Sequence, residues 1–274
     1  MARYQLTLAY DGTDFFGSQR QASTGLSPGA NKRTVQGELE KALGSLGWTG
    51  RSVIMAGRTD TGVHATGQVA AVDLDWSHTD GELVRALNAA LPADLAVQGA
   101  RMVAAKFHPR FDAASRRYRY RLFCQPVRDP IRERFAWRVW PAPDGDALAA
   151  TARLFTGTHD FSAFGSPTTP RGGTVRTVME AGWVAGRDEW SFDIRADAFL
   201  YRMVRKLVFV QVAVAQGNAS AEALARALAE PVSAGTGGGT RTAVPAGLAP
   251  AHGLTLVEVR YPSTESIGQS EQNF

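Results

Sequence analysis

Cysteine is almost absent from this sequence. Cys124 is the only one in 274 residues, so no disulfide can form within the chain and no cluster of thiolates can hold a metal ion. Such sparse use of cysteine is typical of proteins that work in a reducing compartment. We therefore expect a cytoplasmic protein.

Long apolar runs and cofactor signatures are absent as well. No stretch approaches 18 consecutive apolar residues, and MARYQLTLAY at the start has no charged leader before an apolar segment, so neither membrane spanning nor secretion is expected. The sequence has no HExxH motif, no paired-cysteine pattern, and no Walker A or GxGxxG loop after a strand. The five histidines show no metal-binding spacing, lying at positions 64, 78, 108, 159 and 252. We expect an activity that needs no metal and no other cofactor.

The charge balance is only modestly positive. Thirty Lys and Arg against 26 Asp and Glu give a formal net charge of +4, with a sequence pI near 9.4. This excess suits an ordinary soluble enzyme as well as a nucleic-acid binder whose charge lies on one face. With 44% hydrophobic residues, the chain can bury a sizeable core, as one large domain or as two of about 130 residues.

Hydrophobic periodicity predicts interleaved strands and helices. Tyr4 to Tyr10 alternates like a half-buried strand, and apolar residues recur at helical spacing from Val35 to Leu46, with Thr34 as the expected N-cap. Asp80 is expected to cap a helix that ends before Pro92. Further helices are expected at 146–155, 199–216 and 221–229, and strands at 52–55, 68–74, 116–122, 182–185, 190–196 and 254–261. The elements do not alternate regularly, which favours an α+β fold with antiparallel sheet.

The composition changes near residues 103–114, and we place a domain boundary there. This predicts an N-terminal α+β domain at 1–105 and a C-terminal α+β domain at 106–262, each with a sheet and helices on one side. The segments 21–33 and 233–242, rich in small and polar residues, are expected to be flexible surface loops. The polar tail 263–274 is expected to be disordered.

One carboxylate lies inside a stretch rich in glycine and threonine, MAGRTDTGVHATGQV, from Met55 to Val69. A short apolar strand precedes it, and Gly62 and Gly67 permit positive φ, so Asp60 is expected at an exposed tip that a ligand can approach closely. Arg58 can hold that carboxylate ionised or grip a phosphate beside it. On these residues alone, an ordinary turn is the commoner explanation.

A second informative segment is RRYRYRL, from Arg116 to Leu122. In a strand, Tyr118 and Tyr120 project to one face, and the arginines at 117, 119 and 121 project to the other. The tyrosines can belong to the core or stack on a base, and the arginines can be solvated or pair with phosphates. The alternation by itself favours a core and a solvated face.

The long helix expected at 199–216 also has two sides. Its apolar stripe includes Leu200, Met203 and Leu207, and the opposite side carries three cations at 202, 205 and 206. A basic stripe of this kind is usually solvated, so the pattern alone predicts no site.

The string GRTDTGVHATGQV closely resembles the central motif of the TruA-type tRNA pseudouridine synthases. Six further blocks match that family in order: AYDGTDFFG, RTVQGELEKAL, RRYRYRL, GTHDFSAF, DAFLYRMVRKLV and PAHGLTLVEVRYP. Together the blocks cover roughly residues 3–262, and so many matches in the right order are hard to obtain by chance. The resemblance therefore extends over nearly the whole chain.

The resemblance implies an isomerase that converts uridine to pseudouridine in tRNA, at positions 38 to 40 of the anticodon arm. It also implies two α+β domains that meet at an active-site cleft, and a homodimer. Asp60 falls at the nucleophile, which could attack C1′ of the ribose or C6 of the uracil, or open a glycal route by deprotonating the ribose. Tyr118 would line the site against the uracil, Arg205 would form a salt bridge with Asp60, and Arg58 would help extrude the uridine and fill its place.

Two other classes of function stay open. An RNA-binding module without catalysis would use the same basic residues, and a hydrolase built on Asp73 and Asp75 would need Mg²⁺ and release phosphate. The chain departs from the family pattern at Ser18, where tryptophan is common, and at Phe209, where glycine is frequent. These departures put in doubt the packing where the first strand meets its loop, and the spacing between the long helix and its neighbour.

Overall fold

The computed structural model describes residues 1–20, 32–169, 172–229 and 244–262. The tail expected to be disordered lies outside these residues, as do the predicted loop at 233–242 and most of the one at 21–33. In the described part, ten strands form one sheet with the main order β4-β1-β3-β10-β5-β9-β8-β7; β2 pairs with β3, and β6 pairs with β5. Five α-helices accompany the sheet, so the α+β prediction is confirmed.

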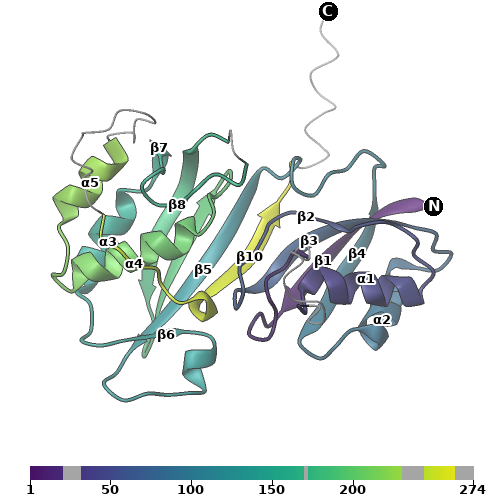
Figure 1. Cartoon of the computed structure of the whole chain (residues 1–274), viewed down its shortest axis with the longest axis horizontal. Coiled ribbons are helices and arrows are strands. Elements are labelled where there is room, and N and C mark those ends of the chain that lie inside the picture. Colours follow the sequence, from purple (N-terminus) through teal and green to yellow (C-terminus); the bar gives the residue numbers. More distant parts are fainter. Residues whose placement is uncertain (21–31, 170–171, 230–243, 263–274) are drawn as a thin grey trace, which may run out of the picture.

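The first half of the chain builds one end of this sheet. Its strands pair antiparallel, and the helices lie beside them (Figure 1). Thr34 caps the first helix as predicted, because its side chain accepts a hydrogen bond from the Gly37 N–H. The cap of the second helix is Thr79 rather than Asp80, since Thr79 and Glu82 form a capping box. The elements are β1 (Ala2–Tyr10), α1 (Val35–Ser45), β2 (Ile54–Met55), β3 (His64–Leu74), α2 (Asp80–Ala90) and β4 (Leu95–Val103).

The second half builds the other end of the sheet, with its helices beside β7 and β8 (Figure 1). The long helix α4 begins at Met203, later than the expected Phe199, because Arg202 has a left-handed backbone with φ of 62° that no helix can continue through. The elements are β5 (Ser115–Cys124), η1 (Arg132–Arg134), β6 (Trp137–Val139), α3 (Gly145–Arg153), β7 (Gly157–Asp160), β8 (Val175–Ala185), β9 (Trp190–Ala196), α4 (Met203–Ala215), α5 (Ala221–Ala229), η2 (Ala251–Gly253) and β10 (Leu254–Arg260).

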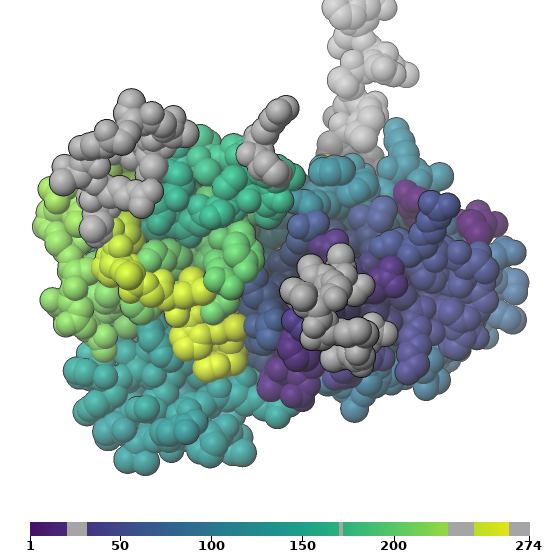
Figure 2. All heavy atoms as spheres, viewed as in Figure 1, coloured from purple at the N-terminus to yellow at the C-terminus, as the bar shows by residue number. Residues whose placement is uncertain are grey.

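The two halves join through β10, the last strand of the described chain. This strand pairs antiparallel with β5 and parallel with β3, where Thr255 lies opposite His64. The joint needs Gly67 for a reason other than the expected positive φ: a Cβ there would lie 2.3 Å from the Val257 carbonyl oxygen. In the space-filling view, residues of the final segment, in yellow, lie at the surface where the earlier and later parts of the chain meet (Figure 2).

The core is continuous across this joint. Leu6 and Leu8 from the first half and Tyr120, Phe192 and Leu256 from the second are all fully buried in one apolar cluster. Burying such large side chains is the main favourable contribution to folding. Within the described residues, no helix is both long and apolar enough to cross a membrane.

Candidate active site

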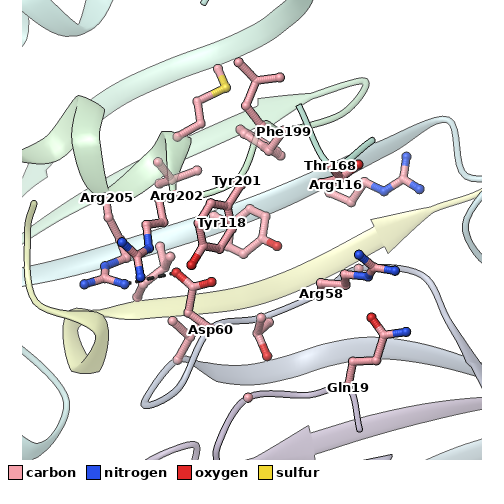
Figure 3. A pocket seen from close by; sticks show the side chains of 18 of the residues that line it. Gln19, Arg58, Asp60, Arg116, Tyr118, Thr168, Phe199, Tyr201, Arg202 and Arg205 are labelled. Atoms are coloured by element: carbon pink, nitrogen blue, oxygen red, sulfur yellow. Dashed lines mark hydrogen bonds and ion pairs between the residues drawn. The ribbon is translucent and has the colours of Figure 1, made fainter. Parts of the chain in front are cut away.

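A cavity of about 610 Å³ opens between residues of the two halves (Figure 3). The first half contributes parts of the segments 16–20 and 56–63, and the second contributes Tyr118, parts of 110–116 and 167–168, and all of 198–205. Three of the four residues predicted to form the site line it from strands and loops, namely Asp60, Arg58 and Tyr118, and Arg205 reaches it from α4. The structure therefore brings together side chains that are up to 147 positions apart in the sequence, from Arg58 to Arg205.

The loop that carries Asp60 is fixed by hydrogen bonds on both sides of Thr59. The Thr59 N–H donates to Ser18 Oγ at 2.9 Å, and the Ser18 N–H donates to the Thr59 carbonyl at 3.0 Å. The Thr59 hydroxyl lies 2.9 Å from the Tyr10 hydroxyl, within the core. Ser18, which stands where the family commonly has tryptophan, thus holds the loop in place through two hydrogen bonds to Thr59.

Two glycines let the same loop turn and pack closely. Gly62 has φ of +78°, a conformation that favours glycine, and follows Asp60 in a turn closed by the Val63 N–H and the Asp60 carbonyl at 3.1 Å. Gly17 has φ of +87°, and a Cβ there would lie 2.9 Å from the Thr59 carbonyl oxygen. The Asp60 side chain is 23% exposed, so it lies in the wall of the cavity and not at the exposed tip that the sequence predicted.

Arg205 forms the predicted salt bridge with Asp60. Its Nη1 lies 3.0 Å from Asp60 Oδ2, while its Nε donates to the Ala249 carbonyl at 2.8 Å. The arginine is 14% exposed, so the pair is shielded from most solvent and its attraction is stronger than at a surface. Among the described residues, nothing donates a hydrogen bond to Asp60 Oδ1, and this oxygen is left for a ligand.

Two of the three cations expected on the basic side of the long helix, Arg205 and Lys206, are held by the backbone of another segment, whereas Arg202 is exposed and precedes α4. Lys206 donates to the carbonyls of Pro245 and Gly247, and Arg205 holds Ala249, so both side chains grip the segment before η2. Burial lowers the pKa of Lys206 from its ordinary value. Phe209 packs on the same segment, where a Cβ at Gly247 would lie 2.2 Å from the Phe209 ring. The second departure from the family pattern is therefore accommodated by a glycine.

Tyr118 and Tyr120 have different places although they share a face of β5. Tyr118 is 8% exposed, lines the cavity and meets the Phe199 ring edge to face at 5.1 Å. No described residue hydrogen-bonds to its hydroxyl group, and burial raises the pKa of Tyr118 above its ordinary value. Tyr120 is fully buried and donates to the Pro250 carbonyl at 2.9 Å, behind the Arg205 contact. Tyr120 is thus a core residue that holds Pro250, next to the Ala249 carbonyl that binds Arg205.

The predicted cations divide into two groups. Arg58 is exposed and lines the cavity, and it makes no hydrogen bond or ion pair with any described residue, Asp60 included. Arg117 and Arg119 instead both bind Asp193, with Nη2 to carboxylate distances of 2.9 and 3.0 Å, and neither lines the cavity. These two arginines therefore belong to an ion-pair cluster with Asp193 outside the cavity.

Arg116 lines the cavity, although the sequence did not predict it as a site residue. Its guanidinium donates to the backbone carbonyls of Ala56, Arg110, Ala113 and Asp197, which lie in both halves. No described carboxylate pairs with it, and burial lowers the pKa of Arg116. The signal was present in the alternation, because Arg116 has the same parity as Tyr118 and so projects to the cavity face. It adds an uncompensated positive charge to this wall.

His64 secures the joint directly behind the Asp60 loop. Its Nδ1 accepts a hydrogen bond from the Gly12 N–H at 3.0 Å, and its Nε2 lies 3.1 Å from the His252 carbonyl in η2. This pattern assigns the proton of a neutral ring to Nε2. Burial lowers the pKa of His64, outweighing the attraction of Asp11 at 3.2 Å. The neutral ring ties the beginning of β3 to the segment that supports Arg205.

Comparison with known proteins agrees with this geometry. The family described as tRNA pseudouridine synthase matches residues 7–112 and 151–262. The chain belongs to this family. It is 44% identical over 266 residues to tRNA pseudouridine synthase A of Solidesulfovibrio magneticus, covering 95% of this chain and 92% of that protein. Proteins of the same name from Chloroflexus aurantiacus and Shouchella clausii are 40% and 37% identical, covering 96% and 100% of this chain and 90% and 100% of theirs.

As a tRNA pseudouridine synthase, the protein is an enzyme that isomerises uridine in tRNA. The hydrolase alternative has no matching site, because Asp73 pairs with Arg3 at 2.6 Å while Asp75 is 91% exposed beside the amino terminus. Within the described residues, no group of three or more His, Cys, Asp or Glu is arranged to hold a metal ion.

Proposed function

We propose that this synthase acts on uridines at positions 38 to 40 in the anticodon arm of tRNA, with Asp60 as its nucleophile. The observation that carries the proposal is the state of the Asp60 carboxylate. One oxygen is held by Arg205 at 3.0 Å, and the other has no described partner and faces a cavity lined by both halves. A reactive group needs this combination of fixed position and unused lone pairs.

The reaction changes which uracil atom is bonded to the ribose. The bond from C1′ to N1 breaks, the base rotates, and a bond from C1′ to C5 forms while C5 loses its proton and N1 gains one. A carboxylate can assist by attacking C1′ or C6, or by taking a proton from the ribose. Each route returns the carboxylate unchanged, so no oxidant, metal ion or ATP enters the balance.

Tyr118 would form one wall of the uracil site. Phe199 holds its ring edge to face, and a planar base can stack on such a ring. Because burial raises the pKa of Tyr118, its hydroxyl group stays protonated near neutral pH. It would therefore donate a hydrogen bond to the rotating base, and any part in removing the C5 proton requires that it pass its own proton on.

Arg58 would extrude the uridine and occupy its place. A base inside a stacked stem cannot reach Asp60 unless it is flipped out, which costs unstacking energy. Arg58 is exposed at the cavity wall and has no described partner to give up. Arg116 and Arg202, which also line the cavity, supply positive charge for the phosphates beside the flipped nucleotide.

We also propose that the synthase is a cytoplasmic homodimer of chains with domains at 1–105 and 106–262. The resemblance of the sequence blocks to the TruA-type family supports the dimer, and the single cysteine fits a reducing compartment. Sedimentation equilibrium tests the dimer directly, because a mass that stays at 29.4 kDa at all concentrations would contradict it.

Release of tritium from uracil C5 tests the function. The enzyme is incubated with tRNA carrying tritium at C5, and then with tRNAs in which cytidine replaces all but one of the uridines at 38, 39 and 40. We expect label release that requires at least one of these uridines. Release that is unaffected when all three are replaced would contradict the proposed position, and no release from any tRNA would contradict the reaction.

Chelation and salt refine the same assay. Activity on tRNA that remains folded should survive EDTA, because no step needs a metal, and it should fall steeply with salt, because phosphate contacts dominate RNA binding. A loss with EDTA that only added Mg²⁺ reverses would revive a metal-dependent mechanism. Binding that does not change with salt would argue against a nucleic-acid substrate.

A further inference from the structure

A smaller cavity of about 250 Å³ adjoins the site and has no part in the chemistry described above. It shares Gln19, Gly57, Arg58 and Arg110 with the main cavity, so the two cavities lie next to each other along these residues. In Figure 3, Gln19, Arg58 and Arg116 lie to the right of Asp60, whereas Arg205 lies to its left. An RNA strand that places one nucleotide beside Asp60 can therefore place a neighbouring nucleotide in the smaller cavity.

The outer wall of this side cavity is an exposed aromatic ring. Phe111 is 77% exposed and stacks on the His108 ring, with ring centres 4.2 Å apart and planes inclined by 26°. An isolated exposed phenylalanine is unremarkable, but this ring borders a hollow next to a cationic RNA site. Among the described residues, no ring other than His108 stacks on Phe111, so its other face can take a planar ring.

Hydrogen bonds fix the His108 ring and the backbone of the loop that carries Phe111 without any ligand. His108 Nδ1 accepts hydrogen bonds from the N–H groups of Arg110 and Phe111, each at 3.2 Å. The His108 N–H donates to Asp112 Oδ2 at 2.9 Å, and Arg116 donates to the Arg110 carbonyl. A preformed stacking surface loses little entropy on binding.

A cation stands between the two cavities. Arg110 lines both of them, its guanidinium donates to the Thr168 hydroxyl at 3.0 Å, and no described carboxylate pairs with it. Consecutive nucleosides in RNA are separated by one phosphate, which an arginine between two base-sized hollows is placed to contact. Gln19, exposed and without a described hydrogen-bond partner, offers amide groups to the edge of a base.

We propose that the side cavity binds the base of the nucleotide next to the target uridine, with Phe111 as its stacking surface and Arg110 on the intervening phosphate. This inference rests on the proposed function, because it assumes that the uridine enters the main cavity. The enzyme would then bind a second base through contacts that do not involve Asp60. Stacking of this kind accepts any base, so the grip contributes affinity rather than sequence choice.

The test uses anticodon stem-loop RNAs with fluorescent 2-aminopurine directly 5′ or directly 3′ of the target uridine. Stacking of 2-aminopurine on an aromatic ring quenches it, so the wild-type enzyme should quench one of the two RNAs. Phe111→Ala and Phe111→Leu should lose this quenching and raise Kd by about 5- to 100-fold. Phe111→Trp should retain both, because it keeps the stacking surface. Phe111→Leu keeps the apolar bulk, so it separates loss of stacking from loss of folding.

Two further measurements keep the outcomes distinct. Ile131→Ala removes another exposed apolar side chain, 81% exposed and outside both cavities, and should bind as the wild type does. Tritium release by the wild type on stem-loops without 2-aminopurine tests the proposed function separately. Normal isomerisation with unchanged binding and quenching in Phe111→Ala would overturn the side cavity alone. Absence of isomerisation by the wild type would overturn the proposed function as well.

Discussion

The two halves of this molecule support their parts of the site in different ways. Asp60 lies on an irregular loop whose position depends on Ser18, Tyr10 and two glycines with positive φ. Tyr118 and Arg205 lie on a strand and a helix, whose regular backbone hydrogen bonds position them, and the Ala249 carbonyl further fixes the Arg205 side chain. A carboxylate on a loop can be approached from several sides, but it needs a scaffold of its own. The second half places its site residues mainly through regular structure, although the left-handed backbone of Arg202 at the start of α4 is an irregular feature beside them.

The sharpest contrast between the halves should come from Asp60→Asn. The amide is nearly isosteric but cannot act as a nucleophile or base, so pseudouridine formation should fall by at least about 10⁴-fold while tRNA affinity changes only a few-fold. Single-turnover tritium release and RNA binding measure the two effects. The matched control is Asp75→Asn, a carboxylate that is 91% exposed and should have wild-type activity. Turnover by pure Asp60→Asn near the wild-type rate would remove Asp60 from the chemistry.

Arg205→Met should have the next largest effect. It leaves the half-buried Asp60 carboxylate without its cation and releases the Ala249 carbonyl, so we expect a loss of about 10²-fold in the single-turnover rate. Arg205→Lys keeps the charge but cannot contact Asp60 Oδ2 and the Ala249 carbonyl oxygen in the same geometry. Its single-turnover rate should therefore lie between those of Arg205→Met and the wild type. Equal rates in Met and Lys variants would show that the charge itself is unimportant.

Breaking the joint between the halves tests whether they work as one unit. Gly67→Ala places a methyl group against the Val257 carbonyl, and overpacking of this kind costs about 1–3 kcal/mol in the free energy of unfolding. Gly99→Ala is the matched control, because Gly99 also lies in a strand and a Cβ there would meet nothing within 4 Å. Urea unfolding measures both variants. If the two variants are equally stable, the backbones of β3 and β10 can move apart at Gly67 without a measurable loss of stability, which would contradict the prediction.

The smallest effect expected is a loss of stability in acid. Burial lowers the pKa of His64 and of His252, so below the unfolded value of about 6.5 the unfolded chain takes up protons that the folded chain resists. Stability is therefore complete above that pH and declines as the pH falls toward the lowered folded values. Thermal melting from about pH 7.5 to about pH 5.5 measures the decline. His64→Gln should flatten it but not abolish it, because His252 remains; an unchanged slope would exclude His64 as the cause.

Much of this fold follows from residue patterns, and the exceptions have physical causes. The helices α1 and α5 have strong apolar periodicity and lie where the pattern predicts them. The start of α4 was placed too early because nothing in the residue type of Arg202 announces a left-handed backbone. The strands β4, β6 and β7 were missed, since the last two are only three and four residues long and β4 has few buried positions.

The site was predictable to the extent that a motif marks it. Asp60 and Tyr118 line one cavity and Arg205 contacts Asp60, as the resemblance implied. Arg116 was not predicted, because the alternating arginines at 117, 119 and 121 project to the other face of the strand. Ser18 and Tyr10 could not be assigned to the loop, because hydrogen bonds between distant segments leave no periodic trace in a sequence.

The central place of β10 in the sheet has a consequence for how the enzyme is made. The ribosome synthesises a chain from its amino terminus, so β10 is the last described strand to emerge, although it pairs with both β3 and β5. Until β10 has left the exit tunnel, neither half has the strand that they share, so the sheet pairing that joins the half with Asp60 to the half with Arg205 is incomplete. An interrupted translation product that ends before Leu254 would thus contain nearly every residue that lines the cavity. It would still be inactive, because it lacks the strand that joins its two halves.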